Sequence, residues 1–472
     1  MMNKNCKYPE WLTEYTFKNC KLNRKEYGEF LANYITGEHD GFVLNLNGAW
    51  GTGKTQFLRR MYSLLTERNH PTIYIDAWES DFSEVPLTVV ASDLITQLSK
   101  INTDIGTDLD KVSEWLGKAL KGSLIAGAGL LTKHLVDDSA SGREIVKNLY
   151  EVSPKDFLSK IKNNHEEQIA AIKNIRKELG LLAEVLKTTH GKELPVVVLI
   201  DELDRCRPNY SIEMLEVIKH FFTTDKFVFL VATDTEQLQK SIKSVYGAEF
   251  DSAVYLKRFF DREAQLSEPD IEHYINLVDF DIDSYEEKLV LYPALEMTID
   301  SNIKKYITWC VLAYDLSLRD TDQLIGKLKA CLRTALNSFE QSKKLQIINI
   351  FSLIVAIIEF DEKHDNFSLR KNKNPLSSRN FKNNLEVKGK LKFHDFYDFN
   401  MHISVKHEIQ SQSYHRNSKL VIGTHPDVRD FDSYDSVIKD AAYDFHNYTY
   451  DTDKLWFWED YQKVVKLAGN II

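Results

Sequence analysis

Eight residues near the start of the chain have the types and spacing of a phosphate-binding loop. Residues 48–55 read Gly-Ala-Trp-Gly-Thr-Gly-Lys-Thr, which fits the pattern G-x-x-x-x-G-K-[ST]. Glycines let the backbone turn so that successive N–H groups face phosphate oxygens, and a following helix adds the positive end of its dipole. Lys54 then brings a full charge to the β- and γ-phosphates, and Thr55 offers a hydroxyl to Mg²⁺. We expect ATP with Mg²⁺ to be held by Gly48, Ala49, Trp50, Gly51, Thr52, Gly53, Lys54, Thr55 and Gln56.

A second group of reactive residues follows the apolar run VVVLI at 196–200. Asp201 falls at the end of this predicted strand, and open α/β sheets bind ligands at that edge. A carboxylate there can hold Mg²⁺ directly or through water, so Thr55 and Asp201 are the predicted metal residues. Glu202 can activate the attacking water as a general base. The alternative is that both acids cap the next helix or lie on a solvated loop.

Hydrolysis of ATP also needs positive charge at the γ-phosphate, so arginines are candidate catalytic residues together with Lys54 and Glu202. Arg205 could act within its own chain or fix Asp201 and Asp204 by ion pairing. Arg258 could reach a neighbouring subunit, and Arg319 could sense the nucleotide state. For each arginine the alternative is an ordinary salt bridge.

Alternating strands and helices must position these residues. Predicted strands at 42–46, 71–77, 194–200 and 227–232 alternate with helices at 55–65, 85–98 and 211–223, which indicates a parallel α/β sheet. Thr233 and Asp234 follow the fourth strand and could sense phosphate, or Asp234 could simply cap a helix. Residues 285–360 read as helices, and 393–472 are ambiguous.

The fold class expected is therefore α/β: a P-loop NTPase core with a parallel sheet, a long helical insertion, a helical lid and a mainly helical C-terminal region. The expected domains are 1–98 and 191–266 for the two parts of the core, 99–190 for the insertion, 267–364 for the lid, and 365–472 for a basic linker with an accessory region.

Composition limits the classes of protein. The net charge of −10 disfavours a whole-surface nucleic-acid binder, although residues 370–392 carry eight Lys or Arg against Glu386 alone. Five cysteines without a C-x-x-C pair argue against a disulfide framework and fit a reducing cytoplasm. No signal peptide is visible, and the apolar runs 123–131 and 347–358 are too short to cross a membrane.

Two weaker features lie near the C-terminus. His394, His402, His407, His415 and His425 cluster loosely with Asp395 and Asp398, but their spacing matches no metal-binding pattern. The run Trp456-Phe457-Trp458 either packs into a core, which we favour, or anchors a partner.

Five ordered motifs resemble those of the KAP family of P-loop NTPases, a branch of the STAND/AAA-like ATPases. The family's loop G-x-W-G-x-G-K-T corresponds to residues 48–55, and its A-W pair corresponds to Ala77-Trp78. Its D-D-L-D-R-C run is similar to DELDRC at 201–206, with Glu202 in place of the second Asp. Further similar segments are VFLVATD at 228–234, DSAVYLKRF at 251–259 and LSLRDTDQL at 316–324.

This resemblance covers about residues 20–335 and implies ATP hydrolysis that switches a helical lid, controlling assembly or a partner. Bacterial relatives often take part in antiviral defence, so the implied partners are copies of the chain in a homo-oligomer or a defence protein. Many relatives carry paired transmembrane helices where this chain has 99–190, so no membrane insertion is expected here. A nucleic-acid-stimulated ATPase and a nucleotide-binding scaffold with little turnover remain alternatives.

Overall fold

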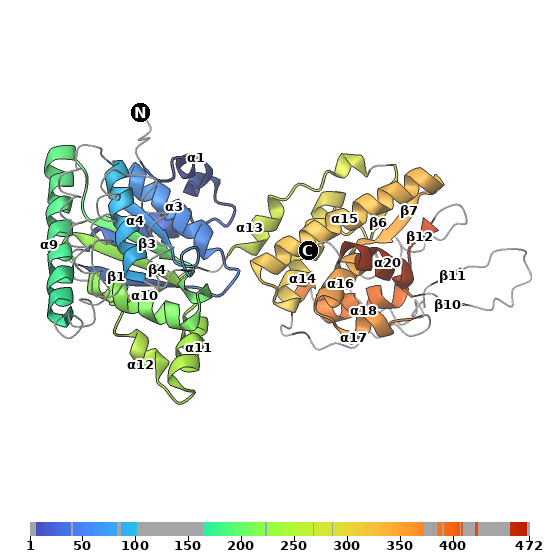
Figure 1. Ribbon diagram of the computed structural model, residues 1–472. Coiled ribbons are helices and arrows are strands. Elements are labelled where there is room, and N and C mark those ends of the chain that lie inside the picture. Colours follow the sequence, from blue (N-terminus) through green and yellow to red (C-terminus); the bar gives the residue numbers. More distant parts are fainter. Residues whose placement is uncertain are drawn as a thin grey trace, which may run out of the picture. The chain divides into compact units, whose positions relative to one another are not determined.

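The computed structural model divides the chain into two units, Met1–Pro269 and Asp270–Ile472. Each unit has its own arrangement of helices around a sheet (Figure 1). The residues that the structure describes are 6–38, 41–82, 86–101, 164–221, 224–267, 269–285, 287–371, 381, 385–388, 391–405, 407–408, 421–422 and 454–469. Most of the predicted insertion, including the apolar run 123–131, lies outside them.

The first unit is built on a five-stranded parallel sheet with the order β2-β3-β4-β1-β5. The four strands predicted from apolar runs are confirmed, and a fifth joins them at the edge. That edge strand reads Arg-Glu-Ala-Gln and is largely exposed, so it has no apolar pattern for sequence reasoning to detect. The strands are β1 (Phe42–Asn47), β2 (Thr72–Asp76), β3 (Val196–Asp201), β4 (Phe227–Thr233) and β5 (Arg262–Gln265).

Alternate residues of the strands point to opposite faces of this sheet, and helices cover both faces (Figure 1). In β3, Val197 and Leu199 pack against one group of helices, whereas Val198 and Ile200 pack against a second group on the other face. The first group is α1 (Trp11–Glu14), α2 (Lys25–Thr36) and α3 (Lys54–Glu67). The second group is α4 (Pro86–Ile101), α9 (Asn164–His190), α10 (Pro208–Phe221), α11 (Thr235–Tyr246) and α12 (Ser252–Leu256).

The second unit is mostly helical, with a three-stranded parallel sheet of order β12-β7-β6. The α-helices that the structure describes there are α13 (Ile271–Asn276), α14 (Ile299–Tyr314), α15 (Leu318–Ser342), α16 (Ile350–Asp361), α17 (Asp365–Leu369), α18 (Phe393–Ile403) and α20 (Trp458–Ala468). The strands of the sheet are β6 (Leu289–Tyr292), β7 (Gln346–Asn349) and β12 (Lys454–Leu455). Short antiparallel pairs join β8 (Glu386–Lys388) to β9 (Leu391–Lys392) and β10 (His407–Glu408) to β11 (Val421–Ile422).

The prediction that residues 285–360 are all helical is wrong at two places, β6 and β7. The apolar run 347–358 begins as a strand and becomes helix α16 at Ile350. Periodicity cannot separate a buried strand from a buried helix in one continuous apolar run. The signal for the change is Asn349, whose side chain accepts a hydrogen bond from the backbone of Ser352 and caps α16. In the described part of the chain, no helix combines the length and apolar character needed to cross a membrane.

The C-terminal aromatic run is part of the core of the second unit, as expected. Trp456 and Trp458 are buried, and their indole N–H groups donate to Gln346 and to the carbonyl of Phe367. These contacts use the only hydrogen-bond donor of each indole. The run therefore packs into a core, as we favoured, and does not serve to anchor a partner.

A buried ion pair lies beside this run. The Arg370 guanidinium, fully buried, donates to both oxygens of Glu359 at 2.7 and 3.1 Å and lies 4.0 Å from the centre of the Trp458 ring. Tyr397 donates its hydroxyl to Glu359 at 2.7 Å. The network therefore links α16, α18 and α20.

We predict that Glu359→Gln lowers the free energy of unfolding of the second unit by about 3–5 kcal/mol, because Arg370 is then a buried charge without a counterion. Urea unfolding of the full chain, followed by tryptophan fluorescence, measures the change. The control is Asp300→Asn, which removes the more exposed pair with Lys304 and is expected to change stability by less than about 1 kcal/mol. Equal effects of the two substitutions would contradict the prediction.

Candidate nucleotide-binding site

The phosphate-binding loop connects β1 to α3 at the carboxyl edge of the parallel sheet. Gly51 and Gly53 have φ values of 83° and 86°, which residues with a side chain rarely adopt. At Gly48 an added Cβ would lie 3.3 Å from the Cβ of Leu266, so the loop passes close to the chain after β5. The helix begins at Lys54, directly behind this turn, so its first N–H groups face the loop.

Lys54 points back into the loop. Its Nζ donates to the carbonyl of Gly48 at 2.7 Å, lies 3.8 Å from the carboxylate of Asp204, and the residue is 9% exposed. A buried ammonium held by carbonyl oxygens and one carboxylate has a defined position, and it can exchange these contacts for phosphate oxygens.

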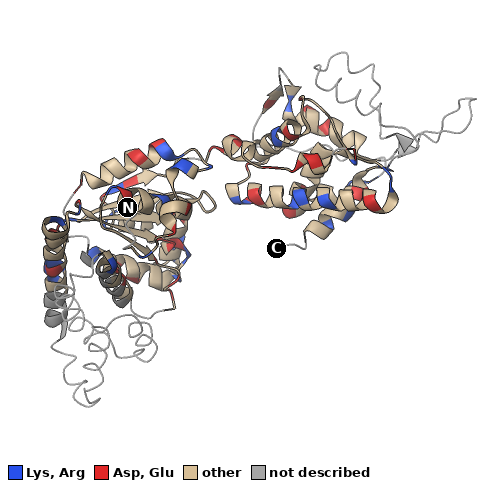
Figure 2. Cartoon of the chain, turned by 90° about the horizontal axis from the view of Figure 1, so that it is seen from above, with Lys and Arg blue, Asp and Glu red and all other residues tan. Residues whose placement is uncertain are grey.

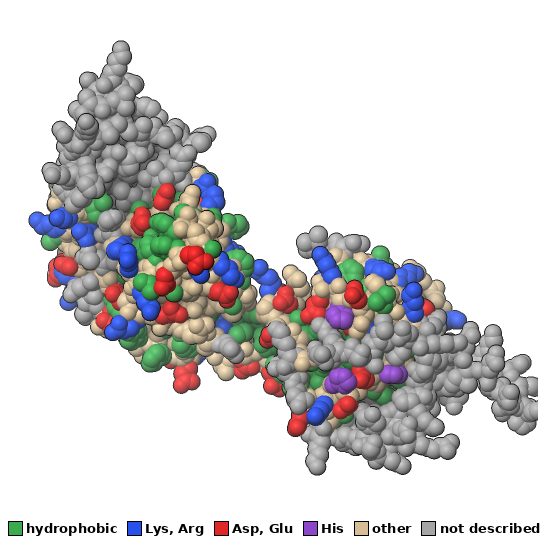
Figure 3. Space-filling view, turned by 90° about the horizontal axis from the view of Figure 1, so that it is seen from below, with side chains coloured by type: hydrophobic (Ala, Val, Ile, Leu, Met, Phe, Trp, Pro, Cys, Tyr) green, Lys and Arg blue, Asp and Glu red, His purple; other side chains and the backbone are tan. Residues whose placement is uncertain are grey.

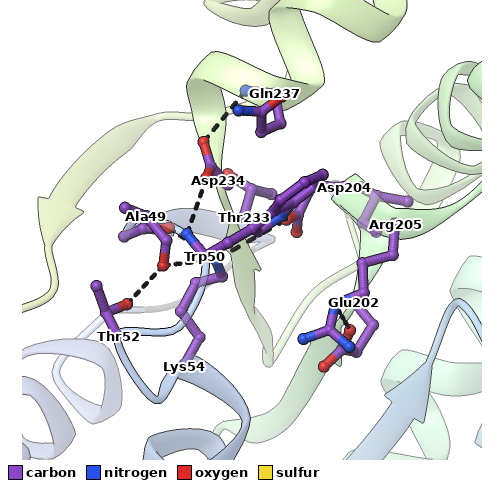
Figure 4. Close-up of polar contacts among 12 residues, drawn as sticks. Ala49, Trp50, Thr52, Lys54, Glu202, Asp204, Arg205, Thr233, Asp234 and Gln237 are labelled. Carbon is purple, nitrogen blue, oxygen red and sulfur yellow. Dashed lines mark hydrogen bonds and ion pairs between the residues drawn. The ribbon is translucent and has the colours of Figure 1, made fainter. Parts of the chain in front are cut away.

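Trp50 fixes the loop to two neighbouring strand ends (Figure 4). Its indole N–H donates to Asp204, which follows β3, at 2.5 Å, and its backbone N–H donates to Asp234, which follows β4, at 3.0 Å. Asp234 also accepts from the backbone of Gln237 at 3.1 Å and so caps α11. The capping interpretation of Asp234 is thus confirmed, and the same carboxylate additionally holds the loop.

The two acids after β3 adjoin the loop. The hydroxyl of Thr55 donates to Glu202 at 2.7 Å, and Glu202 also forms an ion pair with Arg205. The expectation that Arg205 pairs with Asp201 and Asp204 is therefore corrected: in the described part of the chain its carboxylate partner is Glu202. Both residues of this pair belong to the short turn after β3, where Glu202 has a φ of 61°.

Asp201 is 1% exposed, and burial raises the pKa of its carboxyl to about 6. Its oxygens accept hydrogen bonds from the hydroxyl of Tyr74 at 2.8 Å and from the backbone of Glu202 at 2.9 Å. Sequence reasoning missed Tyr74, whose only signal is a hydroxyl-bearing residue between two isoleucines in β2.

These oxygens fit a small divalent cation. A carboxylate whose ionised form is disfavoured by burial, next to a hydroxyl and a second carboxylate, gains from an adjacent positive ion. The described residues contain no group of three or more acidic, histidine or cysteine side chains that would form a closed metal cage. Mg²⁺ typically binds through one or two protein oxygens plus phosphates and water, which is the arrangement that Thr55 and Asp201 can provide.

Thr233 adjoins the loop, since its carbonyl accepts from the backbone N–H of Gly48 at 3.0 Å. The Thr233 hydroxyl donates to Asn45 within the sheet at 2.8 Å, so it is occupied there. Gln56 is exposed on α3 and accepts from Arg60. Arg258 is exposed just after α12, and Arg319 is exposed in the first turn of α15 in the second unit. Within the first unit, the site thus brings together the loop with residues 201, 202, 204 and 205.

The histidine cluster gives no metal site in the part of it that the structure describes. His394 lies 3.3 Å from Asp398, and the His402 ring contacts the carbonyl of Asp398. His415 and His425 lie outside the described residues.

We predict that Asp201→Asn raises the stability of the protein at neutral pH when Mg²⁺ and nucleotide are absent. Because burial raises the Asp201 pKa from 3.8 to about 6, the wild type loses stability as pH rises through this window, and the neutral variant does not. The advantage of the variant should grow between about pH 4 and 6 and level off at about 3 kcal/mol. Thermal unfolding across this pH range tests it.

Saturating Mg²⁺ with ATP should reverse this ranking, since only the wild type keeps the carboxylate for the cation. A stability difference that does not vary with pH would show that the burial of Asp201 carries no such cost.

Comparisons with known proteins bear on the family. A model described as the KAP family P-loop domain matches residues 24–335. No curated protein matches the chain. Among solved structures, AMPPCP-bound DnaA from Aquifex aeolicus is similar, with 12% identity over 83% of this chain and 82% of that chain, at a TM-score of 0.30.

The family match spans the phosphate-binding loop, the acids after β3 and the first part of the second unit. It covers well over half of the chain and includes every contact described for the site. This chain belongs to the KAP family of P-loop NTPases.

Proposed function

We propose that this protein binds and hydrolyses ATP and uses the nucleotide as a switch. The observation that carries the proposal is the 2.7 Å contact between Thr55 and Glu202, which joins the phosphate-binding loop to the acidic turn. Through that contact the groups for binding phosphate, holding a cation and activating water lie within one small site.

Each residue has a defined part in this proposal. Lys54 neutralises the β- and γ-phosphates, while Thr55 and Asp201 would hold Mg²⁺. When bound, the cation offsets negative charge that develops on the phosphate oxygens. Trp50 keeps the loop in register with the acids through its bonds to Asp204 and Asp234.

Glu202 is the proposed general base, and its contacts favour slow basal turnover. Its carboxylate accepts from Thr55 and pairs with Arg205, so both must yield before it can take a proton from water. This observation also supports the second candidate, a nucleotide-binding scaffold with little turnover. The proposed trigger is a rearrangement of Arg205, helped by Arg258 from a neighbouring copy or by Arg319 acting as a nucleotide sensor.

The proposed output is control of assembly or of a partner protein, in a cytoplasmic antiviral-defence role like that of bacterial relatives. Particle mass with and without ATP tests assembly. Protection of cells from phage by the wild type, and its loss in Lys54→Ala, tests the biological role.

The nucleic-acid alternative has less support. One of the eight basic residues at 370–392, Arg370, is buried in the pair with Glu359. In the described parts, acidic and basic residues are interspersed along the helices (Figure 2), and acidic and basic side chains are mixed on the face drawn in Figure 3. ATPase assays with and without DNA or RNA test this alternative.

We predict that Glu202→Gln lowers the rate of ATP hydrolysis by about 100-fold or more while ATP still binds, because the amide cannot accept the proton. Phosphate release and nucleotide titration measure the two effects. Lys54→Ala should instead weaken binding itself.

The matched control is Glu213→Gln on the exposed face of α10, which should leave both quantities unchanged. Full activity in Glu202→Gln would exclude this residue as the base. Absence of turnover in the wild type, with ATP bound, would favour the scaffold.

A further inference from the structure

Arg24 lies just before α2 and connects two distant segments through one guanidinium. Its Nη1 donates to the carbonyl of Thr52 in the phosphate-binding loop at 2.7 Å, and its Nη2 donates to the carbonyl of Ser267 at 2.5 Å. Ser267 follows β5 and stands three positions before Asp270, the first residue of the second unit. The side chain therefore bridges the loop and the chain that leads out of the first unit.

The charge of Arg24 is buried without a counterion. The residue is 3% exposed, and among the described residues no carboxylate pairs with it and its Nε has no hydrogen-bond partner. Burial lowers the pKa of the guanidinium to about 10, so it stays charged at neutral pH. A buried cation held only by carbonyl oxygens is costly, and a polyanion in the neighbouring loop would reduce that cost.

The segment held by Arg24 follows the loop closely. Leu266 donates its backbone N–H to Asn47 at 2.7 Å, immediately before Gly48, and Tyr27 of α2 donates its hydroxyl to the carbonyl of Gln265 at 2.7 Å. Asp270 then caps α13, the first helix of the second unit. The carbonyl that Arg24 holds and the residue that caps α13 are thus three positions apart in the chain.

We propose that Arg24 is a positioning residue that couples nucleotide occupancy of the loop to the segment 265–276. Its two donors belong to one rigid, planar guanidinium, so they hold the two carbonyl oxygens at a fixed distance from each other. Nucleotide in the loop fixes the Thr52 carbonyl and favours the Arg24 charge, and the fork then holds the Ser267 carbonyl in place. The inference rests on the proposed function only in requiring that nucleotide binds.

Hydrogen exchange of the full chain, with and without Mg²⁺ and the non-hydrolysable analogue AMPPCP, tests the coupling. In the wild type, bound analogue should slow amide exchange at 266–276 about tenfold, within the usual range of coupling between sites. In Arg24→Gln and Arg24→Lys, saturating analogue should leave exchange in this segment unchanged. Lysine keeps the charge, so it distinguishes loss of the fork from loss of the charge.

The control is Arg68→Gln, which removes a guanidinium that bonds Asn33 between α2 and α3 but touches neither carbonyl. It should keep the wild-type protection. The inference is overturned if both Arg24 variants, saturated with analogue, protect 266–276 as the wild type does, or if the wild type binds the analogue without protecting this segment. A wild type that binds no nucleotide would instead refute the proposed function.

Discussion

The glycine-rich loop depends on two carboxylates that come from different strands. A loop with two residues at positive φ has much conformational freedom, and ordering it costs entropy. Asp204 and Asp234 offset that cost by accepting the two N–H groups of Trp50. The parallel order β3-β4-β1 is what brings these carboxylates to the same edge. Because Trp50 holds the loop between β1 and Lys54 in place, Lys54 and Thr55 lie next to the acidic turn.

Buried charges are paired in the described part of the second unit and unpaired at two places in the first. In the second unit, the buried Arg370 and Glu359 neutralise each other. In the first unit, Asp201 and Arg24 are buried without a counterion among the described residues. Uncompensated charge lowers stability. Its presence at the site, and not in the described part of the second unit, agrees with a ligand that carries both a cation and an anion.

Much of the first unit could be predicted from its sequence, because its signals are local. Continuous β-branched runs identify buried strands, and the spacing of Gly48, Gly53 and Lys54 identifies the loop. Contacts between distant segments could not be predicted. Arg24 and Ser267 are far apart in the chain, and nothing near either residue indicates the other. Two strands could not be predicted, for opposite reasons. Edge strand β5 is too polar to show a strand pattern, and β7 runs directly into an apolar helix.

The backbone of Glu202 has a further consequence. Its φ of 61° lies in the left-handed region, which asparagine, aspartate and glycine tolerate better than glutamate does. The D-D-L-D-R-C motif of the family has aspartate at this position. The glutamate here has a longer side chain but a less favourable backbone conformation. Substitution at this position therefore involves a trade-off. Aspartate, asparagine or glycine would relax the turn but shorten or remove the carboxylate, whereas glutamate keeps the longer carboxylate and leaves the turn strained.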